Sequence, residues 1–198
     1  MHREIEAKFL SIDFDDLREK LNSLNATRMF ETRVYRRVML DYPDHRFQKD
    51  NHSRRFRVRD EGDKVMLNFK QTNNTNYDDE YEVEVGDFEA TIDLLEAVGF
   101  TIYSYQESRR EAWKLDNCEV VLDEWPWVTP YIEIEGPNEA AIKLVAQKLG
   151  FNWSDARFGS VDVVYMSEYK KMVKNDLVDD IREVKFNAPI PQYFIERR

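Results

Sequence analysis

Charged side chains occupy every second position in several segments of this chain, and most of these sets carry one sign. Because successive side chains of a β-strand point to opposite faces, each set lies on one face of its strand. Apolar residues such as Ile5, Phe56 and Ile134 fill the alternate positions. The sets are Glu4, Glu6 and Lys8; Arg55, Arg57 and Arg59; Glu80, Glu82 and Glu84; and Glu133 and Glu135.

Such sets suit the chemistry of phosphate groups and divalent metals. Guanidinium and ammonium groups bind phosphate oxygens, the guanidinium through paired hydrogen bonds. Carboxylates near a phosphate repel it unless a divalent cation bridges them, and Mg²⁺ and Mn²⁺ accept carboxylate and phosphate oxygens together. The pattern predicts a metal-dependent polyphosphate site. The alternative is that each charged face is solvated, with weak ion pairs across neighbouring strands.

Alternation of this kind requires strands, and the segments between them have helical spacing. Phe14, Leu17 and Leu21, for example, recur every three or four residues. Asp60-Glu61-Gly62-Asp63 separates two strands and predicts a hairpin turn. We expect strands over 4–9, 32–42, 54–59, 64–70, 80–85, 105–115, 118–123 and 131–135. We expect helices over 12–24, 87–99, 137–150, 161–174 and 176–184, and an irregular tail.

These elements predict an α+β protein with about eight strands and helices packed outside. If the strands wrap into a barrel, the charged sets point into one interior. An interior lined with Arg, Lys and Glu contains water and indicates a charged ligand, because an unpaired charge is costly to bury.

Composition excludes several classes of protein. The chain has 198 residues, with 29 Lys and Arg against 39 Asp and Glu, a net charge of −10. This acidic balance argues against a nucleic-acid partner. The six glycines are too dispersed for a phosphate-binding loop or a dinucleotide fingerprint, and Cys118 is the only cysteine. The absence of an apolar stretch of about 20 residues argues against a membrane partner, so we expect a cytoplasmic location.

A resemblance to a known family emerges from the order of the motifs. Glu4-Ile5-Glu6-Ala7-Lys8 is an E-x-E-x-K motif, which is weak evidence by itself, but its companions follow in order. Together they resemble the CYTH family of triphosphate tunnel metalloenzymes over about residues 2–170. The companions are Arg57-Val58-Arg59, Leu67-Asn68-Phe69-Lys70, Glu80-Tyr81-Glu82-Val83-Glu84, Arg110-Glu111-Ala112-Trp113, Leu122-Asp123 and Glu133-Ile134-Glu135.

The resemblance implies an eight-stranded antiparallel β-barrel that forms a triphosphate tunnel, with Mg²⁺ or Mn²⁺ as cofactor. It implies hydrolysis of inorganic triphosphate or of an organic triphosphate such as thiamine triphosphate, and this activity is favoured because it demands least of the site. The alternatives are a class IV adenylate cyclase, which makes cyclic AMP and pyrophosphate from ATP, and a non-catalytic polyphosphate-binding module.

The resemblance also assigns roles to particular residues. Arg36 is preferred to Arg37 because of its distance from Leu40-Asp41. The substrate ligands are Lys8, Arg36, Arg57, Arg59, Lys70 and Arg110, and the metal ligands are Glu4, Glu6, Asp123, Glu133 and Glu135. The catalytic set is Glu4, Glu6, Lys8, Glu82 and Arg110, with Glu82 orienting a base or binding a second metal.

Three regions depart from the family pattern. Ser108 stands where members often have Lys, with Arg109 beside it as the candidate substitute. Trp125 to Pro130 replaces the usual glycine-rich turn, and Tyr165 to Glu168 matches the C-terminal Ser-Tyr motif poorly. Trp125 and Trp127 could stack on a nucleobase or a thiamine ring. The alternatives are that they form a plug within their loop or a contact in a homodimer. We expect a tunnel domain over 1–175, an extension over 176–198 and a small-molecule triphosphate as the partner.

Overall fold

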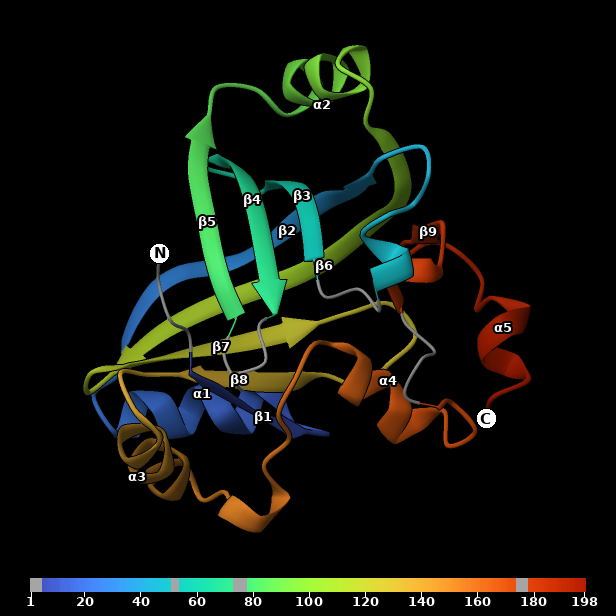
Figure 1. Ribbon diagram of the computed structural model, residues 1–198. Helices are drawn as coiled ribbons and strands as arrows, with labels where there is room; N and C mark the ends of the chain where they lie inside the picture. The colour runs from blue at the N-terminus through green and yellow to red at the C-terminus, as the bar shows by residue number, and fades with distance from the viewer. Residues whose placement is uncertain (1–4, 51–53, 73–77, 174–177) are drawn as a thin grey trace. The chain divides into compact units, whose positions relative to one another are not determined.

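The computed structural model describes residues 5–50, 54–72, 78–173 and 178–198 (Figure 1). These residues form two compact units, which we describe separately. Unit 1 contains the described residues of 34–107 and 178–188, and unit 2 contains those of 5–33, 108–173 and 189–198. No helix in this part of the chain is long and apolar enough to cross a membrane.

The strands form a mainly antiparallel sheet, which confirms the expected α+β class and its eight strands. Hydrogen-bonded neighbours follow the order β1-β8-β7-β6-β2-β3-β4-β5. The eight strands are β1 (Glu6–Leu10), β2 (Thr27–Asp41), β3 (Arg54–Asp60), β4 (Val65–Thr72), β5 (Asp78–Val85), β6 (Thr101–Leu115), β7 (Cys118–Glu124) and β8 (Tyr131–Glu135). A two-residue strand, β9 (Glu183–Val184), pairs with β6 in parallel.

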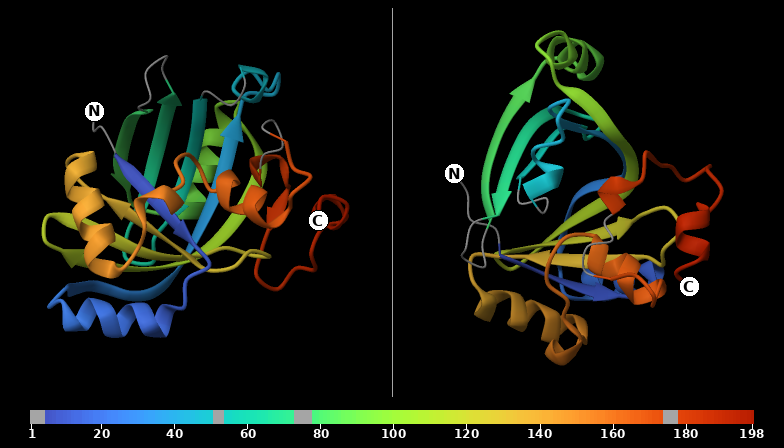
Figure 2. Two further views of the ribbon diagram at one scale, coloured as in Figure 1. Left: turned by 90° about the horizontal axis from the view of Figure 1, so that it is seen from below. Right: turned by 45° about the vertical axis from the view of Figure 1, so that its right-hand side comes forward.

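In unit 1, one face of the β2-β3-β4-β5 region packs against a helix; the left view of Figure 2 shows these strands side by side. Helix α2 (Phe88–Ala97) begins after Asp87, whose carboxylate accepts the backbone N–H of Ala90 at 2.7 Å. Its apolar residues Phe88, Ile92 and Leu95 pack against Val38 and Val58 among others. The hairpin turn between β3 and β4 is also present, since Glu61 N–H donates to the Lys64 carbonyl at 2.9 Å.

In unit 2, two helices cover the apolar face of β1, β7 and β8 (Figure 1). They are α1 (Phe14–Ser23), capped by the Asp13 carboxylate, and α3 (Glu139–Leu149), which ends at Gly150 with a φ of 95°. The core beneath them includes Cys118, which is fully buried. A Cβ added at Gly136 would lie 2.7 Å from the Cys118 sulfur, so only glycine fits beside this thiol.

The C-terminal region differs most from the sequence expectation. Helix α4 (Asp162–Glu168) ends before the predicted 174. The described part of the predicted helix over 176–184 is instead the 3₁₀ turn η3 (Val178–Asp180) followed by β9, because pairing with β6 overrides the local helical spacing. The tail contains a short helix, α5 (Gln192–Ile195). Two further 3₁₀ turns are η1 (Gln48–Asp50) and η2 (Trp153–Asp155).

Candidate functional site

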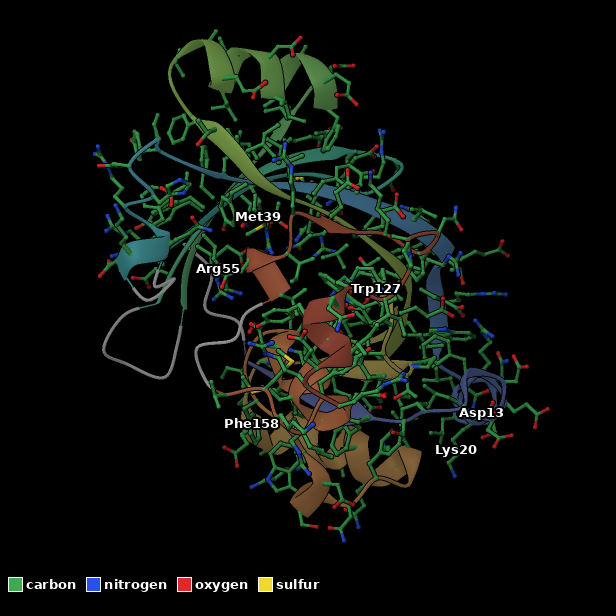
Figure 3. All side chains as sticks on the ribbon, turned by 90° about the vertical axis from the view of Figure 1, so that its right-hand side faces the viewer. Asp13, Lys20, Met39, Arg55, Trp127 and Phe158 are labelled. Atoms are coloured by element: carbon green, nitrogen blue, oxygen red, sulfur yellow. The ribbon has the colours of Figure 1, made fainter. Side chains whose placement is uncertain are left out.

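Unit 1 carries one set of charged residues on the sheet face opposite α2. Residues directly opposite each other in antiparallel strands point to the same side. Arg37 is paired with Arg59, Arg57 with Asn68, and Asn68 with Glu82, so register places them together. We call this set the basic face: Arg37, Arg55, Arg57, Arg59, Asn68, Lys70, Glu80, Glu82 and Glu84. Figure 3 labels Arg55 on β3.

Ion pairs order the basic face around the carboxylates of β5. Glu80 is buried and lies 3.4 Å from Arg57 Nη2 and 3.7 Å from Lys70 Nζ. Asn68 is fully buried and donates its amide N–H groups to Glu80 and, at 2.9 Å, to Glu82. Arg59 Nη2 lies 3.2 Å from Glu82. Asn68 therefore fixes both carboxylates, and these in turn position three of the cations.

Buried polar atoms of the basic face include Arg57 Nε, a donor, and Asn68 Oδ1, an acceptor, and neither has a hydrogen-bond partner among the described residues. Burial, together with the charge of Arg59, lowers the pKa of Arg57 to about 10. An incompletely paired, desolvated guanidinium is stabilised by an anion that brings its own oxygen atoms. The basic face thus fits a phosphate group.

Arg36 does not lie on the basic face. It donates to Asp60 through Nε at 3.1 Å and Nη2 at 2.6 Å, and its guanidinium stacks 4.9 Å from the ring centroid of Phe88, the first residue of α2. Arg37, its neighbour in sequence, is buried and paired in register with Arg59. Register thus places Arg37, and not the arginine selected from the sequence, among the other cations.

Unit 2 carries a second charged set, on the sheet face opposite α1 and α3. Glu6 is paired with Glu135 and Lys8 with Glu133 across β1 and β8, and Arg110 is paired with Asp123 across β6 and β7. We call this set the acidic face: Glu6, Lys8, Arg110, Lys114, Glu119, Asp123, Tyr131, Glu133 and Glu135.

Two cations, the buried Lys8 and the half-buried Arg110, hold the carboxylates of the acidic face. Lys8 Nζ contacts Glu6 and lies 3.2 Å from Glu133. Arg110 donates to Asp123 through Nε at 2.9 Å and to Glu133 through Nη2 at 2.7 Å. Burial alone would raise the pKa of Glu133, but Lys8 and Arg110 outweigh it and lower that pKa to about 2. Glu133 is therefore ionised at neutral pH.

The acidic face has the donor chemistry for a hard divalent cation. Carboxylate oxygens are the ligands that Mg²⁺ and Mn²⁺ prefer. No group of three His, Cys, Asp or Glu side chains arranged to hold a metal is present in the described ranges, and Glu4 lies outside them. Lys8 and Arg110 act as counter-ions of Glu6, Asp123 and Glu133 in this structure. The carboxylates match the metal in donor chemistry, but binding would have to displace these counter-ions and bring the carboxylates together.

The structure thus divides the residues selected from the sequence into two groups. Unit 1 brings together Arg57, Arg59, Lys70 and Glu82. Unit 2 brings together Glu6, Lys8, Arg110, Asp123, Glu133 and Glu135.

Sequence reasoning weighed Arg37 but preferred Arg36, and it gave no role to two residues that contact or accompany these sets, namely Asn68 and Tyr131. The Tyr131 hydroxyl donates to Asp123 at 3.2 Å. Strand parity would have found Asn68 and Tyr131, since each alternates in step with the charged residues of its own strand.

Comparison with known proteins gives a family and a fold. The family model of the CYTH domain matches residues 2–159. A search of curated protein sequences finds no match.

Several solved structures share the fold. PH1012 of Pyrococcus horikoshii OT3 is 24% identical with a TM-score of 0.65, over 81% of this chain and 98% of that one. A Vibrio parahaemolyticus protein proposed to be an adenylate cyclase is 14% identical with a TM-score of 0.71, over 82% and 97%. HpAC1 of Hippeastrum, a proposed adenylyl cyclase with a dominant triphosphatase activity, is 13% identical with a TM-score of 0.57, over 87% and 99%.

Proposed function

Since the chain belongs to the CYTH domain family, we propose that it is a divalent-metal-dependent triphosphatase. Its substrate would be inorganic triphosphate or an organic triphosphate such as thiamine triphosphate. The observation that carries the proposal is the opposite charge excess of the two faces. The basic face has five cations and three carboxylates, and the acidic face has three cations and five carboxylates, counted over the residues that define each face.

The basic face would supply phosphate ligands. Arg57, Arg59 and Lys70 neutralise phosphate oxygens, and Arg37 takes the place that the sequence argument gave to Arg36. Arg57 Nε would donate to a phosphate oxygen, which would satisfy a buried donor that lacks a partner among the described residues. Glu82, held by Asn68, orients the water that attacks the terminal phosphorus.

The acidic face would supply metal ligands, namely Glu6, Asp123, Glu133 and Glu135, together with Glu4. When bound, Mg²⁺ or Mn²⁺ stabilises the charge that develops on the phosphate oxygens. Lys8 and Arg110 exchange their carboxylate partners for phosphate oxygens. In the reaction, the water oxygen bonds to the terminal phosphorus as the P–O bond to the leaving diphosphate breaks, so that orthophosphate forms and one proton is released.

A cyclase is the second candidate, because a structural neighbour is proposed to be an adenylate cyclase. Cyclisation needs a pocket for adenine in addition to phosphate ligands. The aromatic residues best suited to stack on a base are otherwise engaged, since Trp125 is buried and Trp127 packs against Phe194 with ring centroids 5.6 Å apart. This favours hydrolysis.

The deciding experiment is to incubate purified protein with Mg²⁺ or Mn²⁺ and, in parallel, inorganic triphosphate, thiamine triphosphate and ATP. We expect orthophosphate from one of the first two substrates, and no release when the metal is chelated. Cyclic AMP and pyrophosphate from ATP would establish the cyclase instead. Binding of all three without any product would show a polyphosphate-binding module.

A further inference from the structure

The connection between β7 and β8, residues 125–130, joins two residues of the acidic face. It begins two residues after Asp123 and ends one residue before Tyr131, whose hydroxyl donates to the Asp123 carboxylate at 3.2 Å. The connection is therefore flanked by the two partners of that hydrogen bond.

Three side chains of the α4 region bond to this connection. The Tyr165 hydroxyl donates to the Pro126 carbonyl at 2.7 Å, and the Tyr169 hydroxyl donates to the Trp127 carbonyl at 2.6 Å. The Glu168 carboxylate accepts the backbone N–H of Thr129 at 2.8 Å. These three side chains thus bind the carbonyls of two successive residues and one backbone N–H group of the connection.

The short helix α5 completes this arrangement through one aromatic ring. Phe194 is fully buried and stacks on the rings of Tyr165 and Tyr169, with centroids 5.0 Å and 4.7 Å away. It also packs against Trp127, which Figure 3 labels beside the C-terminal helices. The backbone N–H of Lys171 donates to the Arg197 carbonyl at 3.0 Å and ties the two segments together.

The backbone of the connection needs this support. Trp127 has a φ of 69°, in the left-handed region that a bulky side chain rarely adopts. Such a conformation persists only where surrounding contacts hold it. The carbonyl of Trp127 and its ring are the two groups that the C-terminal region contacts.

We propose that Tyr165, Glu168, Tyr169 and Phe194 form a clamp that positions Asp123 and Tyr131 on the acidic face. All four residues lie beyond the matched CYTH region, which ends at 159. They are positioning residues, because they act through the β7-β8 connection. This inference rests on the proposed function, in which Asp123 is a metal ligand.

The first test removes only two hydroxyl groups. In the full-length double variant Tyr165→Phe and Tyr169→Phe, we expect faster amide hydrogen exchange over 123–131. With tripolyphosphate present, we expect at least about tenfold weaker Mn²⁺ binding by electron paramagnetic resonance. Metal-free binding of tripolyphosphate should stay unchanged. Tyr81→Phe, at an exposed tyrosine of unit 1, is the matched control and should change none of these values.

The second test removes the aromatic ring. Phe194→Ala should produce the same two changes, whereas Phe158→Ala, at a 57% exposed phenylalanine of unit 2, should not. Unchanged exchange over 123–131 in both test variants would overturn the clamp. Faster exchange with unchanged Mn²⁺ affinity would overturn its role in positioning Asp123. Failure of the wild type to bind Mn²⁺ would overturn the metal role of the acidic face itself, and with it the purpose assigned to the clamp.

Discussion

The basic and acidic faces are built alike but hold their charges differently. The basic face lies opposite α2 and the acidic face lies opposite α1 and α3, and each combines cations with carboxylates. On the acidic face, Lys8 and Arg110 have close carboxylate partners, whereas the contact of Arg57 with a carboxylate among the described residues is the long one to Glu80, at 3.4 Å. The pKa shifts agree, since the pKa of Arg110 is raised and that of Arg57 is lowered.

Under the proposed function, the sign of the charge excess would decide which ligand each face binds. Where carboxylates outnumber cations, every buried cation finds a partner and the surplus oxygens suit a metal. Where cations outnumber carboxylates, a guanidinium is left desolvated and suits a phosphate. Four measurements test this contrast.

The largest effect is expected from the acidic face. Glu133→Gln removes the carboxylate shared by Lys8 and Arg110, and with it a proposed metal ligand. We expect kcat for triphosphate hydrolysis to fall at least about 100-fold, because metal-supplied charge stabilisation is worth several kcal/mol. Steady-state phosphate release at saturating Mn²⁺ measures it, and a kcat within a few-fold of wild type would contradict the assignment.

The next effect concerns the basic face. Arg57→Gln should weaken metal-free binding of tripolyphosphate about 10- to 100-fold, since a charged hydrogen bond contributes roughly 1.5–3 kcal/mol. Calorimetry in the presence of EDTA measures this affinity. Arg36→Gln is the control, because it removes an arginine from the opposite face of the same sheet. Equal losses in the two variants would mean that the faces do not differ in phosphate binding.

A change in the opposite direction is expected at Lys8. Lys8→Met removes the counter-ion of Glu6 and Glu133, so Mn²⁺ without substrate should bind about tenfold more tightly than to wild type. Electron paramagnetic resonance measures free Mn²⁺ directly. Weaker Mn²⁺ binding in a folded Lys8→Met protein would show that this lysine does not compete with the metal.

The smallest effect is on stability in acid. The pKa of Glu133 is about 2 in the folded protein, below its value of roughly 4.3 in an unfolded chain. Its stabilising contribution is thus complete above about pH 4.3 and is lost as the pH falls towards 2. Urea unfolding over this window should show a shallower pH dependence for Glu133→Gln than for wild type. If the free energy of unfolding depended on pH equally in wild type and Glu133→Gln, the ion pairs of Glu133 would not stabilise the folded protein.

Strand parity is what made most of the candidate site predictable. It placed Glu6 with Lys8 and Arg57 with Arg59 correctly on common faces, because the two-residue period is local. It could not choose between Arg36 and Arg37, since adjacent residues always point to opposite faces and only the pairing with β3 decides which is which.

The C-terminal region shows what lies beyond local patterns. The segment 178–184 was expected to be helical, but pairing with β6 fixes its conformation. The contacts of Tyr165, Tyr169 and Phe194 join positions about 30 to 70 residues apart in the chain, and periodicity carries no information about such pairs. The division into a tunnel domain over 1–175 and an extension stays a prediction.

The buried thiol of unit 2 is a built-in probe of how often the core of that unit opens. Cys118 is the only cysteine of the chain, it is fully buried beside Gly136, and burial raises its pKa. Alkylating reagents attack the thiolate, so they can modify this protein only during transient openings of the core beneath α1 and α3. The rate of modification therefore reports how often β7, the strand that carries Asp123, comes apart from its neighbours.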